Sequence, residues 1–294
     1  MQPRAHRLSL NSCATLMLIP GACIALLCFV VFTAWTALIS LTDSRLLPNY
    51  QIAGWLQYRR LFASDHWWTA TGNFVIYAAC IVGGCILLGY ALALLIDRGV
   101  RWGNVYRTIF LLPLSISFVV TGLIWRWLLE PGLGAQHALR EAGWTSFTFD
   151  WLVRSDRAIY TIAMASIWQH VGIAMLVFLA ALRGVDLNIW KIARVDGIPS
   201  WRMYVHVITP LLRPAFATAA MLLLCTAIKT FDVVVTLTSG GPGFSSDLPA
   251  RFVVELMQRQ ELGMAAAGAC LLLAAAAAAI GPYLYIEGRR RRLA

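Results

Sequence analysis

The sequence predicts an all-α membrane protein with six transmembrane helices and both termini in the cytoplasm. Of its 294 residues, 60% are hydrophobic and 13% are charged, and the mean hydropathy is +0.70. These values lie far outside the balance of a soluble globular domain. A helix needs about 20 predominantly apolar residues to cross a hydrocarbon core of about 30 Å. Runs of that length cover residues 15–40, 74–96, 108–128, 159–182, 214–238 and 263–286.

The first run follows Arg4 and Arg7, as a signal peptide would. It is too long for the apolar region of a signal peptide, and no clear small-residue cleavage site precedes Asp43. We therefore expect it to remain as an uncleaved first span. The sixth run is dominated by alanine, which lets backbones approach closely, so we expect it to pack inside an assembly.

The basic residues predict which side of the membrane each loop occupies, because cytoplasmic loops carry an excess of Lys and Arg. With six spans, both termini and two loops lie on one side. That side carries fourteen Lys or Arg against four acidic residues, and the opposite side carries nine Arg against nine acidic residues. The first side is therefore predicted to be cytoplasmic. This bias accounts for the net charge of +10 without a nucleic-acid partner.

The most distinctive cytoplasmic segment lies between the fourth and fifth runs and reads IARVDGIPSWRMYVHVITPLLRP over residues 192–214. Lys191 to Val195 can continue a helix, Gly197 suits the left-handed position that ends one, and Pro199 suits the first turn of another. Two short helices with a bend are therefore predicted. The second carries apolar residues at helical spacing, which are Trp201, Tyr204, Val205 and Ile208.

This apolar face needs a partner, because the segment lies outside the predicted spans. The partner can be the lipid interface, the chain's own helical bundle or another protein. Met203 and its polar neighbours are expected to point away from the face.

The segment resembles the EAA loop of binding-protein-dependent ABC importers, whose pattern is E-A-A, three residues, G, nine residues and I-x-L-P. Matching positions are Ala193, Asp196, Gly197 and Pro210. Trp201 and Tyr204 occupy the family's usual aromatic positions, and Val207 replaces Ile. Three positions depart from the family's Glu, Ala and Leu, namely Lys191, Ile192 and Thr209. These departures leave the loop's identity secure but remove the Glu that could form a salt bridge.

The resemblance covers nearly the whole chain. IWQHVGIAMLVFLAALRGV looks like the family's fourth span, and RTIFLLPLSISFVVTGLIW with GLGAQHAL looks like its third span and exit. FDVVVTLTSGGPGFSSDLPARFVVE is similar to the segment leaving the fifth span in maltose-type carbohydrate permeases, especially those for glucose or mannose. The implied architecture is the type I ABC importer permease fold. It comprises a tail, first span and periplasmic loop at 1–70, a transmembrane domain at 71–288 with a coupling loop at 183–213, and a basic tail at 289–294.

The resemblance implies a permease of the bacterial inner membrane that forms half of the path for a sugar delivered by a periplasmic solute-binding protein. A second permease would complete a heterodimer, and an ATPase dimer with ATP and Mg would receive the coupling loop in a cleft. The coupling residues implied are Lys191, Ala193, Asp196, Gly197, Trp201, Tyr204, Val207 and Pro210. The chain has only two lysines and neither follows a glycine-rich phosphate loop, so no ATPase, catalytic or metal site and no cofactor is expected in it.

A sugar path needs hydrogen-bonding groups and flat apolar faces. Trp168 and Gln169 supply both in the fourth run, where they either contact sugar or pack the bundle, while His170 is expected to be structural. Lys229 and Asp232 lie three residues apart in the fifth run and are expected to share a helix face. They either form a structural ion pair, snorkel to the interface, or line the path.

The segment after the fifth run contains a glycine-rich turn at residues 240–243, predicted to be a flexible exit loop rather than a phosphate cradle. SSDLPARFVVELMQRQELG then predicts an amphipathic helix, with one face formed by Phe252, Glu255, Leu256 and Arg259. This helix either contacts the solute-binding protein or forms a solvated lid.

Two other classes of protein stay open on the sequence. An ion-coupled secondary transporter of small solutes would also be a polar-lined bundle, but it usually shows inverted repeats, and none is detectable here. A membrane-embedded enzyme would need a convergent catalytic set, and none appears in the sequence.

The predicted orientation can be tested by cysteine labelling. A cysteine introduced after Arg292 should react with a membrane-impermeant reagent only from the cytoplasmic side, because both termini belong to the basic side. A cysteine at Asp150 should show the opposite accessibility. Labelling of the C-terminal cysteine from outside would overturn the orientation.

Overall fold

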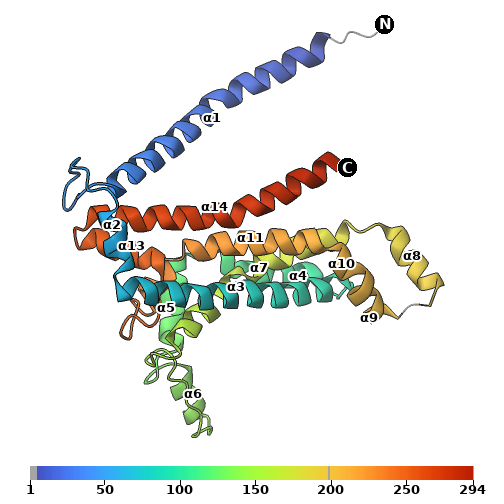
Figure 1. Cartoon of the computed structure of the whole chain (residues 1–294). Coiled ribbons are helices and arrows are strands. Elements are labelled where there is room, and N and C mark those ends of the chain that lie inside the picture. The colour runs from blue at the N-terminus through green and yellow to red at the C-terminus, as the bar shows by residue number, and fades with distance from the viewer. Residues whose placement is uncertain (1–4, 198, 294) are drawn as a thin grey trace. The chain divides into compact units, whose positions relative to one another are not determined.

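The computed structural model of the chain describes residues 5–197 and 199–293 (Figure 1). Arg4 of the predicted N-terminal tail, Ile198 of the predicted coupling loop and Ala294 of the basic tail lie outside this description. Every described element is helical, apart from one antiparallel bridge between Thr42 and Ile52. The prediction of an all-α protein is confirmed.

The chain divides into two compact units. The smaller unit consists of residues 1–63 and 256–271, and the larger unit consists of residues 64–255 and 272–294. Two helices contribute residues to both units, α13 (Pro249–Gln258) and α14 (Leu262–Leu293).

The smaller unit is built on α1 (Ala5–Ser40) and α2 (Leu56–Phe62). Gln57 fixes the connection between them, because its Nε2 donates to the Thr42 carbonyl and to Asp43 Oδ1, both at 3.1 Å. From Leu18 onward the side chains of α1 are largely exposed. This exposure is what an apolar helix has when lipid rather than protein surrounds it.

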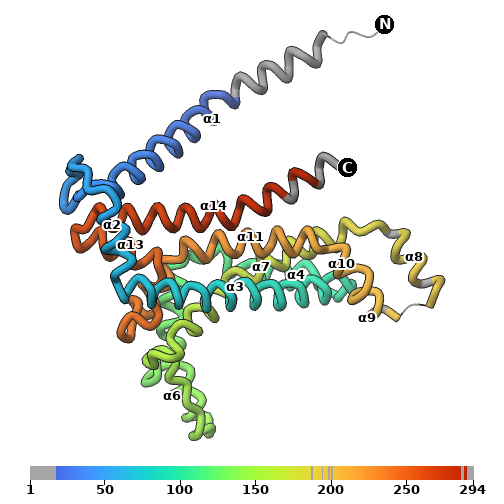
Figure 2. Tube along the Cα trace, in the orientation of Figure 1, coloured from blue at the N-terminus to red at the C-terminus, as the bar shows by residue number. Residues whose placement is uncertain are grey.

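The larger unit is centred on three helices that pack against one another, α3 (Asp65–Asp97), α7 (Ala158–Arg183) and α11 (Arg213–Ile228) (Figures 1 and 2). The long helices α3 and α7 contain no proline, which would remove a backbone donor. Their shared core includes Ile81, Ile162, Met175, Phe178 and Leu223, all almost fully buried. Around it, α4 (Gly103–Ser115) packs on α7, and α5 (Phe118–Leu128) packs on α12 (Asp232–Leu237).

Short helices lie at opposite ends of this centre (Figure 1). One end carries α6 (Ala135–Glu141). The other carries α8 (Leu187–Val195), α9 (Ser200–Met203), a π-helical turn at Tyr204–Ile208 and α10 (Thr209–Leu211). The predicted pair of short helices with a bend is confirmed, and Gly197 between them has the expected left-handed φ of +65°.

Within the described part of the chain, four helical segments are long and apolar enough to cross a membrane, and the number reaches six if each of two bent pairs counts as one span. The four are Leu18–Ser40, Asp65–Asp97, Ala158–Arg183 and Leu262–Tyr285. The bent pairs are Gly103–Ser115 with Phe118–Leu128, at 99°, and Trp201–Leu211 with Arg213–Ile228, at 65°.

The second, third and fifth predicted apolar runs differ from the helices found in ways that affect the arrangement of the bundle. The second helix begins at Asp65 rather than at residue 74, because its polar first turns are held by contacts to a distant loop. The third run is broken between Ser115 and Phe118. The fifth run is broken between Ile228 and Asp232. Apolarity indicates that a segment belongs in lipid, but it does not report whether the helix is continuous.

Candidate functional site

The predicted coupling loop exposes a group of apolar side chains at the end of the bundle, four of which are more than half exposed. Ile192 and Val195 of α8, with Trp201 and Val205 beyond the bend, are between 57% and 87% exposed. Apolar side chains gathered in water favour contact with a partner. Of the other implied coupling residues, two are buried, Ala193 and Tyr204, and five are exposed, namely Lys191, Asp196, Gly197, Val207 and Pro210.

The single apolar face predicted for the second short helix is wrong. The π-helical turn at Tyr204–Ile208 contains more residues per turn than an α-helix, so side chains at α-helical spacing no longer align. Tyr204 and Ile208 are buried in the core, together with Met203, which was expected to point elsewhere. Trp201 is therefore exposed, and Tyr204 faces the chain's own helices.

Tyr204 and Thr209 attach the loop to α3. The Tyr204 ring lies edge-on to Trp190, with centroids 5.3 Å apart, and the Arg98 guanidinium lies 5.2 Å above it. The Thr209 hydroxyl donates to the Tyr204 carbonyl at 2.7 Å and accepts from the Tyr90 hydroxyl of α3 at 2.6 Å. Thr209, which departs from the family's Leu, thus has a specific role in joining the loop to α3.

A cavity of about 230 Å³ lies at the break in the fifth apolar run. Its lining residues are Phe118, Ser166, His170, Thr226, Lys229, Thr230, Phe231, Asp232 and Val233. Because α11 ends at Ile228 and α12 begins at Asp232, Lys229 and Asp232 do not share one helix face as predicted. Both line the cavity instead, and among the described residues neither forms an ion pair.

The break is supported by Tyr77 of α3, a residue that the sequence analysis did not single out. The Tyr77 hydroxyl donates to Ser166 Oγ of α7 at 2.9 Å and lies 3.1 Å from the Thr230 hydroxyl within the break. Its side chain is fully buried. A phenol in the middle of an apolar run was the only sequence signal of this role.

His170 forms part of the cavity wall. Its Nδ1 lies 2.8 Å from the Ser166 carbonyl, which can only accept, so Nδ1 carries the proton. The ring stacks on Phe118 at 5.7 Å between centroids. The predicted structural role of His170 is compatible with these contacts, while its position also brings it to the cavity.

Trp168 and Gln169 do not line the cavity. Gln169 is buried, and its Nε2 donates at 2.9 Å to the carbonyl of Ile116, which lies in the break between α4 and α5. Trp168 lies edge-on to Trp125, with centroids 6.0 Å apart. Of the four residues predicted for the substrate path, the structure brings only Lys229 and Asp232 together at a cavity.

At the opposite end of the larger unit, a charge network fixes the glycine-rich segment to α3. The buried Asp247 accepts through Oδ2 from His66 and Arg251, both at 2.6 Å, and Arg251 also donates to Glu255 at 2.8 Å. Asn73 donates to the Asp247 carbonyl at 3.1 Å. The predicted exit loop is therefore pinned by several hydrogen bonds rather than free.

This network resembles a cation-binding site in its geometry, because possible ligand atoms of His66, Asp247 and Glu255 lie within 4.8 Å of one another. The guanidinium of Arg251 bonds both carboxylates, so it already supplies the positive charge. Gly240 makes room for it, since a Cβ there would lie 2.7 Å from Arg251 Nη1. The network is therefore a structural ion cluster. Burial raises the pKa of Asp247, and the adjacent Arg251 and His66 oppose that rise.

The amphipathic helix predicted after the glycine-rich turn is present as α13. Phe252 on its apolar face is buried, with its ring 4.4 Å from that of His66. Glu255 is half-buried and pairs with Arg251. The first turns of α13 thus pack within the larger unit.

Residues 85–292 match the family model described as the binding-protein-dependent transport system inner membrane component. A probable ABC transporter permease of Pyrococcus horikoshii is 35% identical over 274 residues, which cover 92% of this chain and 94% of that protein. A xylose/arabinose import permease of Haloferax volcanii is 33% identical and covers 87% of this chain and 81% of its own length.

Solved structures show the same fold. A bacterial ABC transporter that imports the acidic polysaccharide alginate aligns over 97% of this chain and 99% of its own, with a TM-score of 0.76 and 19% identity. The alginate transporter in complex with a periplasmic protein bound to alginate pentasaccharide aligns with a TM-score of 0.78 and 20% identity, over 99% of this chain and 98% of its own.

Replacing Arg251 with Met should destabilise the larger unit, because the buried Asp247 carboxylate would keep one side-chain partner among the described residues, His66. Loss of one partner of a buried ion pair costs about 3–5 kcal/mol. Thermal unfolding of purified protein at pH 7.5 should show a lower midpoint. Arg154→Met, which removes exposed ion pairs to Asp150 and Asp156, should leave the unfolding midpoint nearly unchanged.

The pH dependence gives a second readout of this variant. Arg251 opposes the rise of the Asp247 pKa, so its removal raises that pKa further. A carboxyl with a raised pKa binds protons preferentially in the folded state. The stability lost in Arg251→Met should therefore shrink as the pH falls from 7.5 toward 5. Equal midpoints for variant and wild type at pH 7.5 would contradict the network's role.

Proposed function

The chain belongs to the family of inner membrane components of binding-protein-dependent transport systems, and we propose that it forms half of the translocation path for a sugar in an ATP-driven importer. The xylose/arabinose import permease, which is similar over most of its length, supports a carbohydrate substrate. The family match favours this function over an ion-coupled secondary transporter. The multi-pass permease thus lies in the inner membrane.

The observation that carries the proposal is the exposed apolar surface of the coupling loop. Ile192, Val195, Trp201 and Val205 lie outside the four unbroken candidate spans, at one end of the bundle. We propose that they bind an ATPase dimer. ATP and Mg would bind to this ATPase and not to the permease. A second permease would complete the path, and a periplasmic solute-binding protein would deliver the sugar.

Movement of the ATPase would reach the membrane helices through the contacts of the loop. Tyr204 packs against Trp190 and beneath Arg98, and Thr209 bonds Tyr90. Tyr90 belongs to α3 and Arg98 directly follows it. A displaced loop would therefore move α3 with it. We propose that Trp201 acts as the docking residue and Tyr204 as the residue that transmits the displacement.

The sugar would pass the cavity at the helix break. Discontinuous helices in transporters expose backbone and polar side chains at the substrate site. Here Lys229 offers donors, Asp232 offers acceptors, and Phe118 and Phe231 offer flat apolar faces for the C–H face of a sugar. Thr226 and Thr230 add hydroxyls to the same wall.

Trp201→Ala should weaken association with the ATPase, because truncating an aromatic anchor at an interface commonly costs about 2 kcal/mol or more, which is about thirtyfold in affinity. The ATPase recovered with the purified complex and its stimulated hydrolysis report the effect. Trp102→Ala removes another exposed tryptophan outside the loop and should change neither quantity. Full recovery of ATPase with Trp201→Ala would refute the docking assignment.

Asp232→Asn should assemble normally yet transport poorly or with altered sugar preference. The reason is that Asp232 forms no ion pair among the described residues, so its neutralisation strands no partner. Complex yield and sugar uptake in proteoliposomes are measured together, with Asp156→Asn as an exposed control. Wild-type uptake and preference in Asp232→Asn would remove the residue from the path, and a reduced yield would show a structural role.

A further inference from the structure

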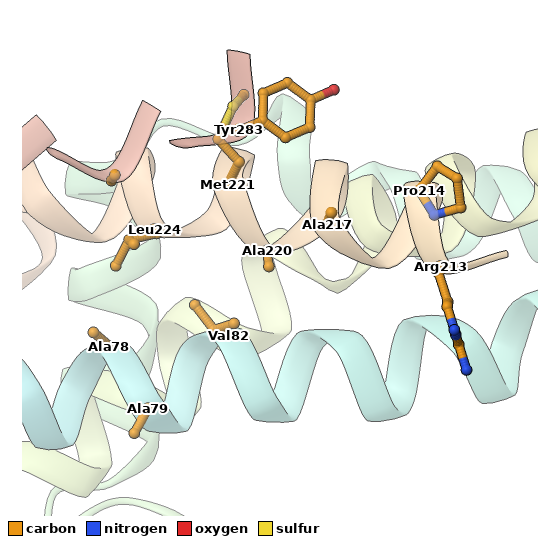
Figure 3. Close-up of a pocket in the computed structure, with 11 residues that line it drawn as sticks. Ala78, Ala79, Val82, Arg213, Pro214, Ala217, Ala220, Met221, Leu224 and Tyr283 are labelled. Carbon is orange, nitrogen blue, oxygen red and sulfur yellow. The ribbon is translucent and has the colours of Figure 1, made fainter. Parts of the chain in front are cut away.

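A second cavity, of about 600 Å³, lies among α3, α11 and α14 within the larger unit (Figure 3). Small and apolar side chains dominate its walls, including Ala79 of α3 and Ala217, Ala220 and Leu224 of α11. Arg213 is the only charged residue among those that line it. None of its lining residues belongs to the cavity at the helix break.

The length of the cavity corresponds to one leaflet of a bilayer. Its lining on α11 runs from Arg213 to Leu224, which are eleven residues apart. At about 1.5 Å per residue this is about 16 Å, or about half of a hydrocarbon core of about 30 Å. Arg213 lies at the outer end of this half, where α11 begins.

Arg213 places a positive charge, without an acidic partner among the described residues, at one end of the apolar cavity. Its side chain is exposed and forms no ion pair with the described part of the chain. Figure 3 shows it reaching from α11 toward α3. Farther along the cavity, the Tyr283 hydroxyl of α14 lies 3.0 Å from the Thr218 hydroxyl of α11, and this contact joins the two helices.

We propose that this cavity binds one phospholipid with an anionic head group. The phosphate would lie at Arg213, and an acyl chain would run along Ala217 and Ala220 toward Leu224. The small alanine side chains leave the cavity wide enough for a hydrocarbon chain. Basic pockets between membrane helices on the cytoplasmic side bind anionic head groups. A helix of a partner subunit would cross both leaflets, whereas the cavity spans one and ends at a free cation. Charge and length together favour the lipid.

The proposal can be tested on the full chain, purified with its co-expressed subunits and placed in nanodiscs of mixed phosphatidylglycerol and phosphatidylcholine. A trace of phosphatidylglycerol carries a photoreactive group on its acyl chain, and cross-linked peptides are mapped by mass spectrometry. We expect cross-links within residues 217–224. Unlabelled phosphatidylglycerol should compete about fivefold better than phosphatidylcholine, the effect of one basic residue near a membrane surface.

Matched variants separate the two parts of the site. Arg213→Gln should abolish the preference for phosphatidylglycerol, and Arg213→Lys should retain it. Ala220→Leu, which fills the cavity, should remove the cross-links to the labelled phosphatidylglycerol. Arg101→Gln and Ala91→Leu, an exposed arginine and an exposed alanine outside the cavity, should change neither result.

Two results would overturn the proposal. One is an unchanged lipid preference in Arg213→Gln together with unchanged cross-links in Ala220→Leu. The other is a pair of observations: the wild type gives no cross-link to lipid, and the Ala220→Leu variant loses a partner subunit. That result would show that a protein helix occupies the cavity.

Discussion

A backbone amide or carbonyl in hydrocarbon must find its partner within the protein, because no water is available to replace it. Two of the predicted apolar runs in the larger unit are broken, at Ser115–Phe118 and at Ile228–Asp232, and a buried polar side chain supports each break. Gln169 donates to a carbonyl in the first break, and Tyr77 bonds across the second. An unpaired polar group would cost several kcal/mol. The cavity at Lys229 and Asp232 exists because its break is supported in this way.

The helix α3 contacts each region to which a function has been assigned. Near its start, His66 and Asn73 hold the glycine-rich segment, and in its middle Tyr77 supports the break beside the cavity. Near its end, Tyr90 bonds Thr209 of the coupling loop. α3 contains no proline to bend it. One continuous helix therefore connects the proposed docking surface, the proposed sugar cavity and the far end of the bundle.

The sequence was sufficient to predict the helical class, the apolar runs and the bend at Gly197, because each depends on composition or on neighbouring residues. It was not sufficient for features that depend on distant partners. The π-helical turn displaced Tyr204 from the face that regular periodicity assigned to it. Lys229 and Asp232 stood out as polar exceptions, but nothing local showed that the helix stops between them. Tyr77 gained its importance only from Ser166 and Thr230 on other helices.

The bond between His66 and Asp247 joins residues 181 positions apart in the chain. Ribosomes add about 5–20 residues per second, so the nascent chain carries His66 for roughly 10–40 s before Asp247 is made. Arg251 and Glu255 follow Asp247 within a few residues, so the whole network can form only after the first five predicted spans have been translated. During that interval the first turn of α3 lacks the partners that hold it in the finished protein. Closure of this end of the bundle is therefore a late event in biogenesis, after most of the spans have already been translated.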